Sequence, residues 1–458
     1  MNYNFLGILL SIFLLSSCSL FDGDKQPSHS AFESVKHYEP LDNLNIYEYR
    51  LKKNNMQVFL IPKKGSSQVA YTTAYKVGSR DEEKGKTGLA HLFEHMMFRG
   101  TEKFKDSNIL FTEWAGTRNA TTSFDQTFYY EVAPHHYLDQ MAEFEADRMR
   151  HLKIDAKMYE TEKGAVVSER KMRTVDSVMG KLWWELYQLA YDKHSYKVTP
   201  IGFQKDLDRS TLEDALKFYR SFYAPNNAVV GVSGDFEVSD ALSIIDKYYG
   251  NFESEEVKPS IPTAEPIRSE LRRKVMSVEN AKTVYIADAR LGTTYEDMKK
   301  GSKPVIDYVL CQLLADSKTG YLPSQLVEKA IASSVGQSCG PGIDPDLAVL
   351  LIVGSPGVAA PDLEKKYDLA LKGFESWVTQ EKIDRVKKLF AYEEWSYLRT
   401  PLNIAQDIVK PAGFANIPMY WFDFVKKSET VTKAQVLNRF KVWNKKNHTR
   451  LIFQPKAQ

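Results

Sequence analysis

The alternation of apolar and polar residues along the chain predicts both strands and helices. Short runs rich in β-branched and aromatic residues predict strands at 47–51, 57–61, 68–77 and 228–233. Apolar residues at helical spacing predict helices at about 135–150, 156–190 and 210–222, and a further helix over 88–98. We therefore expect an α+β fold in which helices flank mostly antiparallel sheets.

A repeat relates the two halves of the chain. The run 251–266 is acidic, contains proline and has no period, so we predict a linker there. A shift of 221 residues pairs Thr211 with Thr432 and Tyr219 with Phe440, in each case within a helix that precedes a strand. The sequence thus predicts two similar α/β domains from an internal duplication, at 46–250 and 267–458. The same shift sets 310–316 against 89–95, where the apolar positions persist and the polar ones change.

Two histidines and a glutamate interrupt the apolar helix predicted at 88–98. His91 and His95 are four residues apart, so both imidazoles lie on one helix face and can reach one cation, at about 2.0 to 2.1 Å for zinc. Glu94 shares this face, where a carboxylate can take a proton from a metal-bound water. Surface helices contain such residues by chance, but burying three polar groups in apolar surroundings without partners would cost several kcal/mol. The order His-x-x-Glu-His therefore predicts a zinc site with Glu94 as the catalytic base.

A catalytic zinc site takes three protein ligands and keeps one position open, so one more ligand is needed. Glu162 and Glu169 are two turns apart on the predicted 156–190 helix, and Glu169 is the stronger candidate. Together these motifs resemble the pitrilysin/insulinase family of zinc peptidases, in which a Glu-x-x-x-x-x-x-Glu helix follows the His-x-x-Glu-His helix; here Glu169 lies 74 positions after His95. The resemblance implies that Glu169 is the third ligand and that Glu162 holds a ligand imidazole. A solvated helix face is the alternative for Glu162.

The segment 118–130 resembles the Asn-Ala-x-Thr motif of that family, followed by an aromatic strand. By this resemblance Asn119, Ala120 and Thr121 belong to a sheet edge, to which an extended substrate adds as a strand. Asn119 is also a candidate donor to the developing oxyanion. Without the other motifs, a run rich in Thr and aromatic residues indicates only a strand. Phe93 either lines the pocket beside the scissile bond or belongs to the core.

The resemblance implies a zinc metallopeptidase, with one zinc ion per chain, that cuts peptides or unfolded protein segments. Glu94 takes a proton from the attacking water and returns it to the leaving amine. Two other classes stay open. A structural subunit would keep the fold without the chemistry, as core subunits of respiratory complexes do, but those typically lose the ligands that this chain retains. A lipoprotein that binds zinc for stability alone would lose its fold on chelation.

The resemblance also implies a partner. The second half of family members usually has an Arg-x-x-x-x-x-x-Tyr pair that reaches the substrate, within a stretch similar to 326–334 of this chain. Val327 stands in the place of the arginine and Ser334 in that of the tyrosine, and neither supplies the same hydrogen-bond donors. Half-length members resemble the mitochondrial processing peptidase, in which two homologous subunits enclose a chamber. We therefore predict a heterodimer with a two-domain partner that supplies Arg and Tyr and lacks His-x-x-Glu-His.

The N-terminal residues indicate export. Residues 1–17 have no charged side chain and an apolar core too short for a membrane span, as in a signal peptide. Leu15 to Cys18 resembles a bacterial lipobox, which predicts membrane attachment through a lipidated Cys18 and a polar tether over 18–45. Because no Lys or Arg precedes the apolar core, an unlipidated export signal is the alternative. Ser19 after the cysteine favours the periplasmic side of the outer membrane.

Composition adds further constraints. The 458 residues are 43% hydrophobic and 26% charged, which is typical of a globular protein of two or three domains. The 61 basic and 59 acidic residues leave a net charge of +2, so nothing indicates a nucleic-acid partner. Besides Cys18 the chain has Cys311 and Cys339; we predict buried free thiols, with a disulfide as the alternative in an oxidising compartment.

Overall fold

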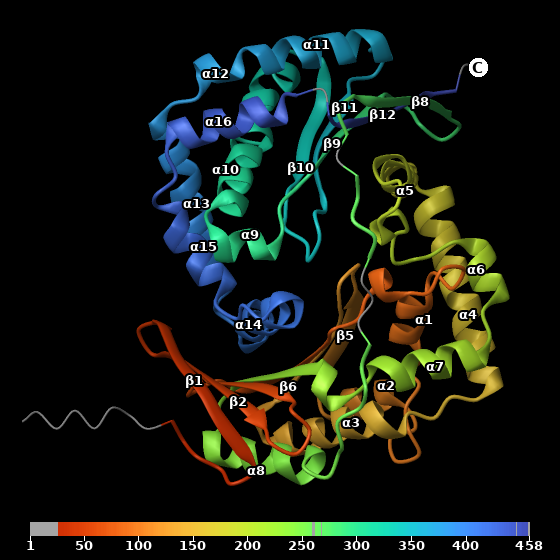
Figure 1. Ribbon diagram of the computed structural model, residues 1–458, viewed down its shortest axis with the longest axis vertical. Helices are drawn as coiled ribbons and strands as arrows, with labels where there is room; N and C mark the ends of the chain where they lie inside the picture. The colour runs from red at the N-terminus through yellow and green to blue at the C-terminus, as the bar shows by residue number, and fades with distance from the viewer. Residues whose placement is uncertain (1–25, 259–261, 267, 446, 457–458) are drawn as a thin grey trace, which may run out of the picture.

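A seven-stranded sheet and a five-stranded sheet form the frame of the protein (Figure 1). The computed structural model describes residues 26–258, 262–266, 268–445 and 447–456. The first sheet contains β1 (Phe32–Leu41), β2 (Leu44–Leu51), β3 (Gln57–Pro62), β4 (Gln68–Tyr75), β5 (Thr117–Thr122), β6 (Thr127–Pro134) and β7 (Ala228–Gly234). The second contains β8 (Arg272–Val278), β9 (Tyr285–Leu291), β10 (Ala332–Ser338), β11 (Leu347–Gly354) and β12 (Thr449–Pro455). Between the halves, the described parts of the predicted linker, 251–258 and 262–266, contain neither helix nor strand.

The two sheets share one topology. The first has the strand order β1-β2-β3-β7-β4-β6-β5 and the second has β10-β11-β9-β12-β8. Read from its other edge, the second sheet repeats the last five strands of the first. This includes one parallel pair, β3 with β7 and β8 with β12, among antiparallel neighbours. The predicted shift of 221 residues carries β7 onto β12 without a gap. The expected α+β fold with two similar, mostly antiparallel domains is confirmed.

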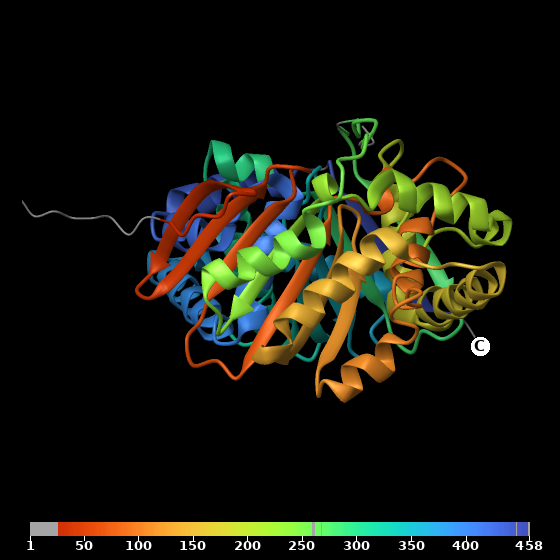
Figure 2. The same cartoon turned by 90° about the horizontal axis from the view of Figure 1, so that it is seen from below.

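Helices pack on the faces of both sheets. The first half contains α1 (Leu89–Met96), α2 (Ser107–Glu113), α3 (Leu138–His151), α4 (Ala156–Arg170), α5 (Val178–Ala190), α6 (Gln204–Arg209), α7 (Leu212–Phe222) and α8 (Val238–Tyr249). The second contains α9 (Tyr295–Lys300), α10 (Lys303–Ala315), α11 (Ala360–Lys372), α12 (Phe374–Trp377), α13 (Gln380–Tyr397), α14 (Pro401–Ala415), α15 (Tyr420–Ser428) and α16 (Lys433–Trp443). Figure 2 shows α3 and α8 lying across the seven-stranded sheet, on the side away from the second half. In the described parts of the chain, no helix is both long and apolar enough to span a bilayer.

Each sheet is also covered by a helix from the other half of the chain. Helix α5 packs on β8, β9 and β12, where Leu186 shares a core with Phe453. Helix α14 packs on β4 and β7 and lies between the two sheets (Figure 1). Gly231 in β7 permits this close approach, because a Cβ there would lie 2.2 Å from Cγ2 of Val409. The two halves are therefore interlocked as well as similar.

The predicted tether is too long. Residues 32–41 form β1, which pairs antiparallel with β2 at the edge of the seven-stranded sheet. Phe32 is buried, and the Tyr38 hydroxyl donates a hydrogen bond of 2.7 Å to Glu48 on β2. Because an edge strand contacts the core with few side chains, its sequence lacks clear hydrophobic alternation. The predicted signal peptide (1–17) and Cys18 lie outside the described residues.

The helix predicted at 156–190 is interrupted. Helix α4 ends at Arg170 and continues into a π-helical segment, η3 (Lys171–Asp176). Ser177 then caps α5 by accepting a hydrogen bond from the amide of Gly180. Gly180 also lets η3 approach α5 closely, since a Cβ at this position would lie 1.5 Å from the carbonyl oxygen of Arg173. Uninterrupted helical spacing in the sequence does not reveal this change of geometry.

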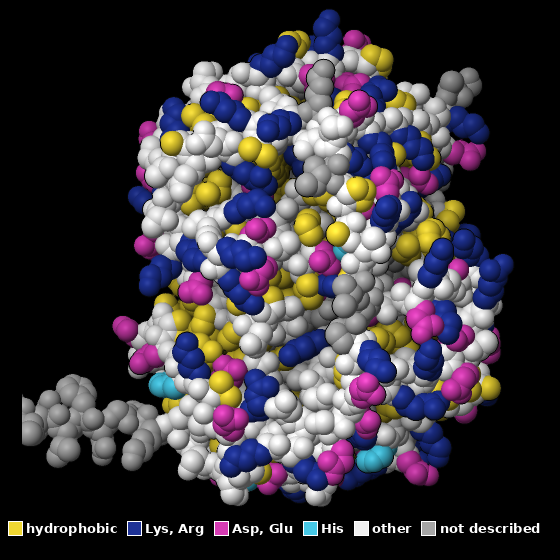
Figure 3. Space-filling view, in the orientation of Figure 1, with side chains coloured by type: hydrophobic (Ala, Val, Ile, Leu, Met, Phe, Trp, Pro, Cys, Tyr) yellow, Lys and Arg dark blue, Asp and Glu magenta, His cyan; other side chains and the backbone are white. Residues whose placement is uncertain are grey.

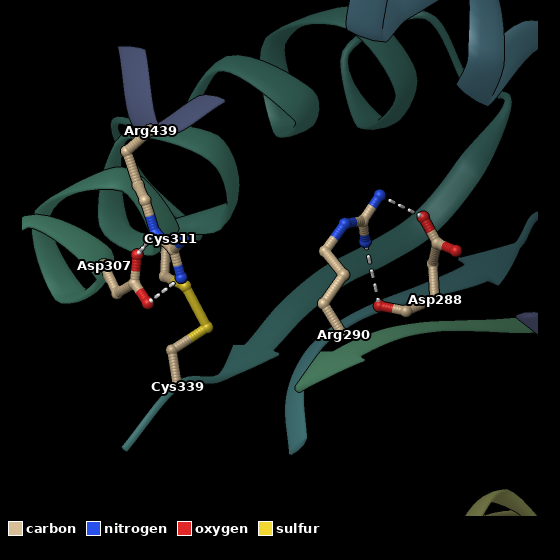
Figure 4. Close-up of a disulfide and its surroundings, with 6 residues drawn as sticks. All are labelled: Asp288, Arg290, Asp307, Cys311, Cys339 and Arg439. Carbon is tan, nitrogen blue, oxygen red and sulfur yellow. Dashed lines mark hydrogen bonds and ion pairs between the residues drawn. A yellow bond between two sulfur atoms is a disulfide. The ribbon is translucent and has the colours of Figure 1, made fainter. Parts of the chain in front are cut away.

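Cys311 and Cys339 form a disulfide, so the prediction of free thiols is wrong (Figure 4). Cys311 lies in α10 and Cys339 directly follows β10, and their Cα atoms are 6.5 Å apart. Hydrophobic spacing could not predict the bond, because it depends on how β10 returns past α10 after 28 residues. Close by, the Asp307 carboxylate accepts a hydrogen bond of 2.7 Å from Arg439, which joins α10 to α16.

Candidate functional site

Helix α1 presents the polar trio predicted from the sequence. The helix starts after Gly88, whose φ of 91° lies in the left-handed region that favours glycine. The Glu82 carboxylate accepts hydrogen bonds from the amides of Gly88 (2.9 Å) and Ala90 (2.8 Å) and thereby satisfies donors of the first turn. The apolar residues of α1 pack into the core of the first half. The start and the orientation of the helix are therefore both fixed.

The structure brings together the three residues predicted to bind metal. Nε2 of His91 lies 3.8 Å from Oε1 of Glu169, and Nε2 of His95 lies 3.3 Å from Oε2 of Glu169. One potential ligand atom from each residue falls within 4.8 Å of the others. Glu169 reaches the histidines because α4 packs against α1. Two imidazole nitrogens and a carboxylate oxygen thus converge on one point.

The chemistry of these donors fits zinc. Burial, followed by the adjacent His95, lowers the pKa of His91 to about 4, so this imidazole is neutral at pH 7. The hydrogen bond with His95 lowers the pKa of Glu169, which keeps this carboxylate ionised. Two imidazoles and one carboxylate are an established ligand set for catalytic zinc, and such a set leaves a fourth position open.

Glu162 lies behind His95. Its Oε2 is 3.1 Å from Nδ1 of His95, and its Oε1 pairs with Arg99. When Nδ1 donates its proton to Glu162, Nε2 of His95 presents a lone pair toward Glu169 and the cavity. The Glu162 side chain is buried, which excludes the alternative of a solvated helix face. The contact is the one expected of a residue that orients a ligand imidazole.

Glu94 lies beside the trio and is almost fully buried. Its Oε2 accepts a hydrogen bond of 2.6 Å from the hydroxyl of Thr122 on β5. Burial raises the pKa of Glu94, and the Thr122 hydrogen bond opposes the rise. A carboxylate with a raised pKa, held beside three candidate ligands, is suited to take up and release a proton near neutral pH.

A cavity of about 1020 Å³ opens over these residues. Asn119, Ala120 and Thr121 of β5 line one part of it, and η3 with the start of α5 lines another. Strand β5 is the outermost strand of the seven-stranded sheet, so its free edge can accept an added strand. The predicted sheet edge is therefore present, next to His91, Glu94 and His95.

Phe93 does not line this cavity; it belongs to the core, which was the second alternative. Its side chain is fully buried and packs against Phe218, Tyr219 and Tyr223 at centroid distances of 4.7–6.2 Å. The physical reason is helix geometry: Phe93 is two residues from both His91 and His95, and this spacing directs it to the opposite face of α1.

Several residues that line the cavity were not predicted from the sequence. Met172 and Arg173 in η3, and Trp183 and Trp184 in α5, all line the cavity. The available signals were the spacing of Glu169 and Arg173, four apart, and the capping residue Ser177 before the tryptophans. Neither signal places these side chains beside the histidines, because that depends on how α4, η3 and α5 fold back over α1.

Comparison with known proteins decides the family. Residues 58–194 match the family model described as insulinase (peptidase family M16), and residues 209–390 match the model described as the peptidase M16 inactive domain. The chain belongs to peptidase family M16. The zinc protease PqqE of Helicobacter pylori is 32% identical over 343 residues, which cover 73% of this chain and 76% of that protein.

A solved structure and a second relative extend this comparison. A crystal structure of a protease from Helicobacter pylori is 25% identical, covers 92% of this chain and 100% of its own, and has a TM-score of 0.84. The probable mitochondrial-processing peptidase subunit beta of Schizosaccharomyces pombe is 28% identical over 180 residues, 38% of this chain and 39% of that protein. These similarities agree with a metallopeptidase family and an α+β fold of two similar domains.

The described residues of the second half contain no matching group of metal ligands. Val327 ends the π-helical segment η6 (Pro323–Val327) and packs against the core of the second half, while Ser334 is exposed on β10. Neither residue lines the cavity described above. In the described residues, His91, His95 and Glu169 form the only group with metal-ligand geometry.

Proposed function

We propose that this chain is the catalytic, zinc-binding subunit of a metallopeptidase that hydrolyses peptides or unfolded protein segments. The observation that carries the proposal is the convergence of His91, His95 and Glu169 beside Glu94, next to the free edge of β5. His91, His95 and Glu169 would hold one zinc ion. Bound zinc would supply Lewis acidity that polarises the scissile carbonyl and acidifies water.

The substrate-binding, proton-transfer and positioning roles fall to residues of the chain itself. An extended substrate adds to β5, whose backbone groups fix its register without demanding a particular sequence. Glu94 takes a proton from the attacking water and returns it to the leaving amine. Thr122 holds the Glu94 carboxylate through its 2.6 Å hydrogen bond. Glu162 keeps the His95 imidazole oriented through Nδ1.

The proposed enzyme works as a heterodimer. Val327 and Ser334, at the positions where the family resemblance places arginine and tyrosine, supply neither a guanidinium nor a phenol. Losing one donor aimed at developing charge costs about 10² to 10³ in rate. The similarity to a mitochondrial-processing peptidase subunit supports a homologous two-domain partner that donates the pair.

The proposed location is the periplasmic side of a bacterial outer membrane, with attachment through lipidated Cys18. The sequence of residues 1–19 is the main support. The disulfide between Cys311 and Cys339 also favours an oxidising compartment, where such bonds persist. Mass measurement of the N-terminal peptide after expression in a Gram-negative host tests the lipid, and an unmodified Cys18 would contradict it.

The decisive experiment measures peptidase activity and bound metal on one preparation that begins at Ser19. We expect a zinc-to-chain ratio near one and slow cleavage of unfolded protein, accelerated by a homologous chain that has the Arg and Tyr. A ratio near zero without cleavage would favour the alternative, a structural subunit. Full activity from the chain alone, unchanged by mutation of Val327 and Ser334, would refute the heterodimer and leave the peptidase.

A further inference from the structure

Arg173 is the single Lys or Arg among the described residues that line the cavity. It lies in η3 directly after Met172, which also lines the cavity, as does Trp183 of α5. The π-helix is rare in proteins, and short π-helical turns are frequent at functional sites. The close contact between the Arg173 carbonyl and Gly180 holds the backbone of η3 against α5. The arginine side chain therefore starts from a fixed position on the cavity wall.

The Arg173 guanidinium is only partly engaged in contacts within the protein. Nη2 lies 2.8 Å from Oε1 of Glu169, and within the described residues this is the only carboxylate paired with Arg173. The side chain nevertheless keeps 67% of its surface exposed. Because a guanidinium carries five N–H donors in a planar fork, donors remain for a second acceptor in the cavity.

The charges in the cavity favour an anionic substrate group. The described lining residues include two carboxylates, Glu94 and Glu169, and both already have partners. A zinc ion would offset their two negative charges, so that Arg173 remains as an excess positive charge. On the face of the molecule in Figure 3, basic and acidic side chains are interspersed.

The position of Arg173 limits which substrate residue it can reach. It contacts Glu169, a proposed zinc ligand, so its unused donors lie close to the place of the scissile carbonyl. An extended strand advances about 3.3 Å per residue and alternates its side chains between two faces. A substrate strand added to β5 would therefore direct a side chain adjacent to the scissile bond toward η3.

We propose that Arg173 selects substrates with an acidic side chain, Asp or Glu, next to the scissile bond. This inference rests on the proposed peptidase function and adds its substrate class. A substrate carboxylate would form a charge-assisted hydrogen-bonded pair with the fork of Arg173, whereas Lys or Arg would meet a like charge.

Cleavage of a peptide mixture tests the preference. Synthetic peptides with randomised central positions are digested with zinc-loaded full-length protein and its partner, and the products are sequenced by mass spectrometry. We expect acidic residues to be enriched about tenfold at one position beside the cut, equivalent to about 1.4 kcal/mol. Arg173→Glu should invert the preference toward Lys and Arg.

Lys171→Glu is the matched control. Lys171 lies in the same segment, its side chain is 69% exposed, it pairs with Asp176, and it does not line the cavity. The control changes the charge by the same amount and should leave the preference intact. Because Arg173 contacts Glu169, zinc is measured on every variant. If Arg173→Glu lowers the zinc content, Arg173→Gln is tested in its place. This variant should abolish the acidic preference without inverting it.

Peptide binding provides a readout that does not need turnover. Fluorescent peptides that differ only by Glu or Lys at each central position are titrated into zinc-loaded Glu94→Gln protein. At one position the Glu peptide should bind about tenfold more tightly, and adding Arg173→Glu should reverse the order. Absence of cleavage by the wild type would overturn the proposed function. Cleavage without an acidic preference, or a preference that survives Arg173→Glu, would overturn this inference alone.

Discussion

The hydroxyl of Thr122 donates a hydrogen bond of 2.6 Å to the carboxylate of Glu94. This bond joins the edge strand β5, where a substrate is proposed to add, to helix α1, which presents two of the three proposed metal ligands. The geometry of the candidate base is therefore coupled to the strand that would hold the substrate. Changes at Thr122 and at Glu94 should have different and separable effects.

Glu94→Gln should remove hydrolysis and keep zinc. The amide preserves the shape of the side chain but cannot accept a proton, so the rate should fall by about 10² to 10⁴. Zinc content is measured by atomic spectroscopy on the same preparation as the peptidase assay. Turnover retained at the wild-type rate would show that Glu94 is not the base.

Thr122→Val should lower the rate by about 10- to 100-fold, since a hydrogen bond to a charged group contributes about 1.5–3 kcal/mol. The same change should move the acidic limb of the pH–rate profile to higher pH. The sign follows from the bond: the hydroxyl stabilises the ionised carboxylate and lowers the pKa of Glu94, so its loss lets the pKa rise. An unchanged pH–rate profile would show that the Thr122 hydrogen bond does not set the pKa of Glu94.

Glu162→Gln should weaken zinc binding by about 10- to 100-fold, because the buried carboxylate orients the His95 imidazole. Glu160→Gln is the control. Glu160 lies on the same helix but is exposed and pairs only with Lys163 among the described residues. Competition with a chelator of known affinity gives both constants. Equal affinities in the two variants would mean that the contact between Glu162 and His95 is not needed to hold the metal.

Asp288→Asn should destabilise the folded protein by about 3–5 kcal/mol, because it leaves the buried guanidinium groups of Arg290 and Arg450 without their anion. Burial alone would raise the pKa of Asp288, but Arg290 and Arg450 outweigh it and hold the pKa well below its usual range. The contribution of Asp288 is therefore present above about pH 4, the ordinary pKa of an aspartate, and is lost as the pH falls further.

Urea unfolding of the Asp288 variant, at neutral pH and near pH 3, measures this dependence. The difference from the wild type should shrink in acid. Asp192→Asn is the exposed counterpart: Asp192 pairs with Arg272 at 2.7 Å, and its side chain is 42% exposed. Its loss should cost less than about 1 kcal/mol. A similar cost for both variants would show that burial of the Asp288 network does not set its contribution.

The sequence predicted those parts of the fold and the site that depend on local spacing. Hydrophobic periodicity located α1 and β7, and the shift of 221 residues located β12, the counterpart of β7 in the second half. Helical spacing placed His91, His95 and Glu94 on one face, and the family resemblance paired them with Glu169. The structure brings these residues together, and their catalytic roles stay predictions for the experiments above.

The features that escaped prediction depend on contacts between distant segments. Phe93 had two alternatives because the packing of α7 against α1, which decides between them, is not visible in local spacing. The pairing of Cys311 with Cys339 follows from the path of β10. Arg173 and the two tryptophans reach the cavity only because η3 turns α5 back toward α1. Strand β1 was hidden because an edge strand has little hydrophobic alternation.

The exchange of α5 and α14 has a consequence for how the chain folds. A fragment that ended in the linker would contain α5 without the sheet that α5 covers, and it would leave the face of β4 and β7 that α14 covers open to water. Each half therefore depends on a helix of the other half to complete its core, although the two halves share one topology. If two separate chains exchanged helices in this way, the result would be a domain-swapped dimer. Here the linker joins the two exchanging halves, so the exchange takes place within one polypeptide.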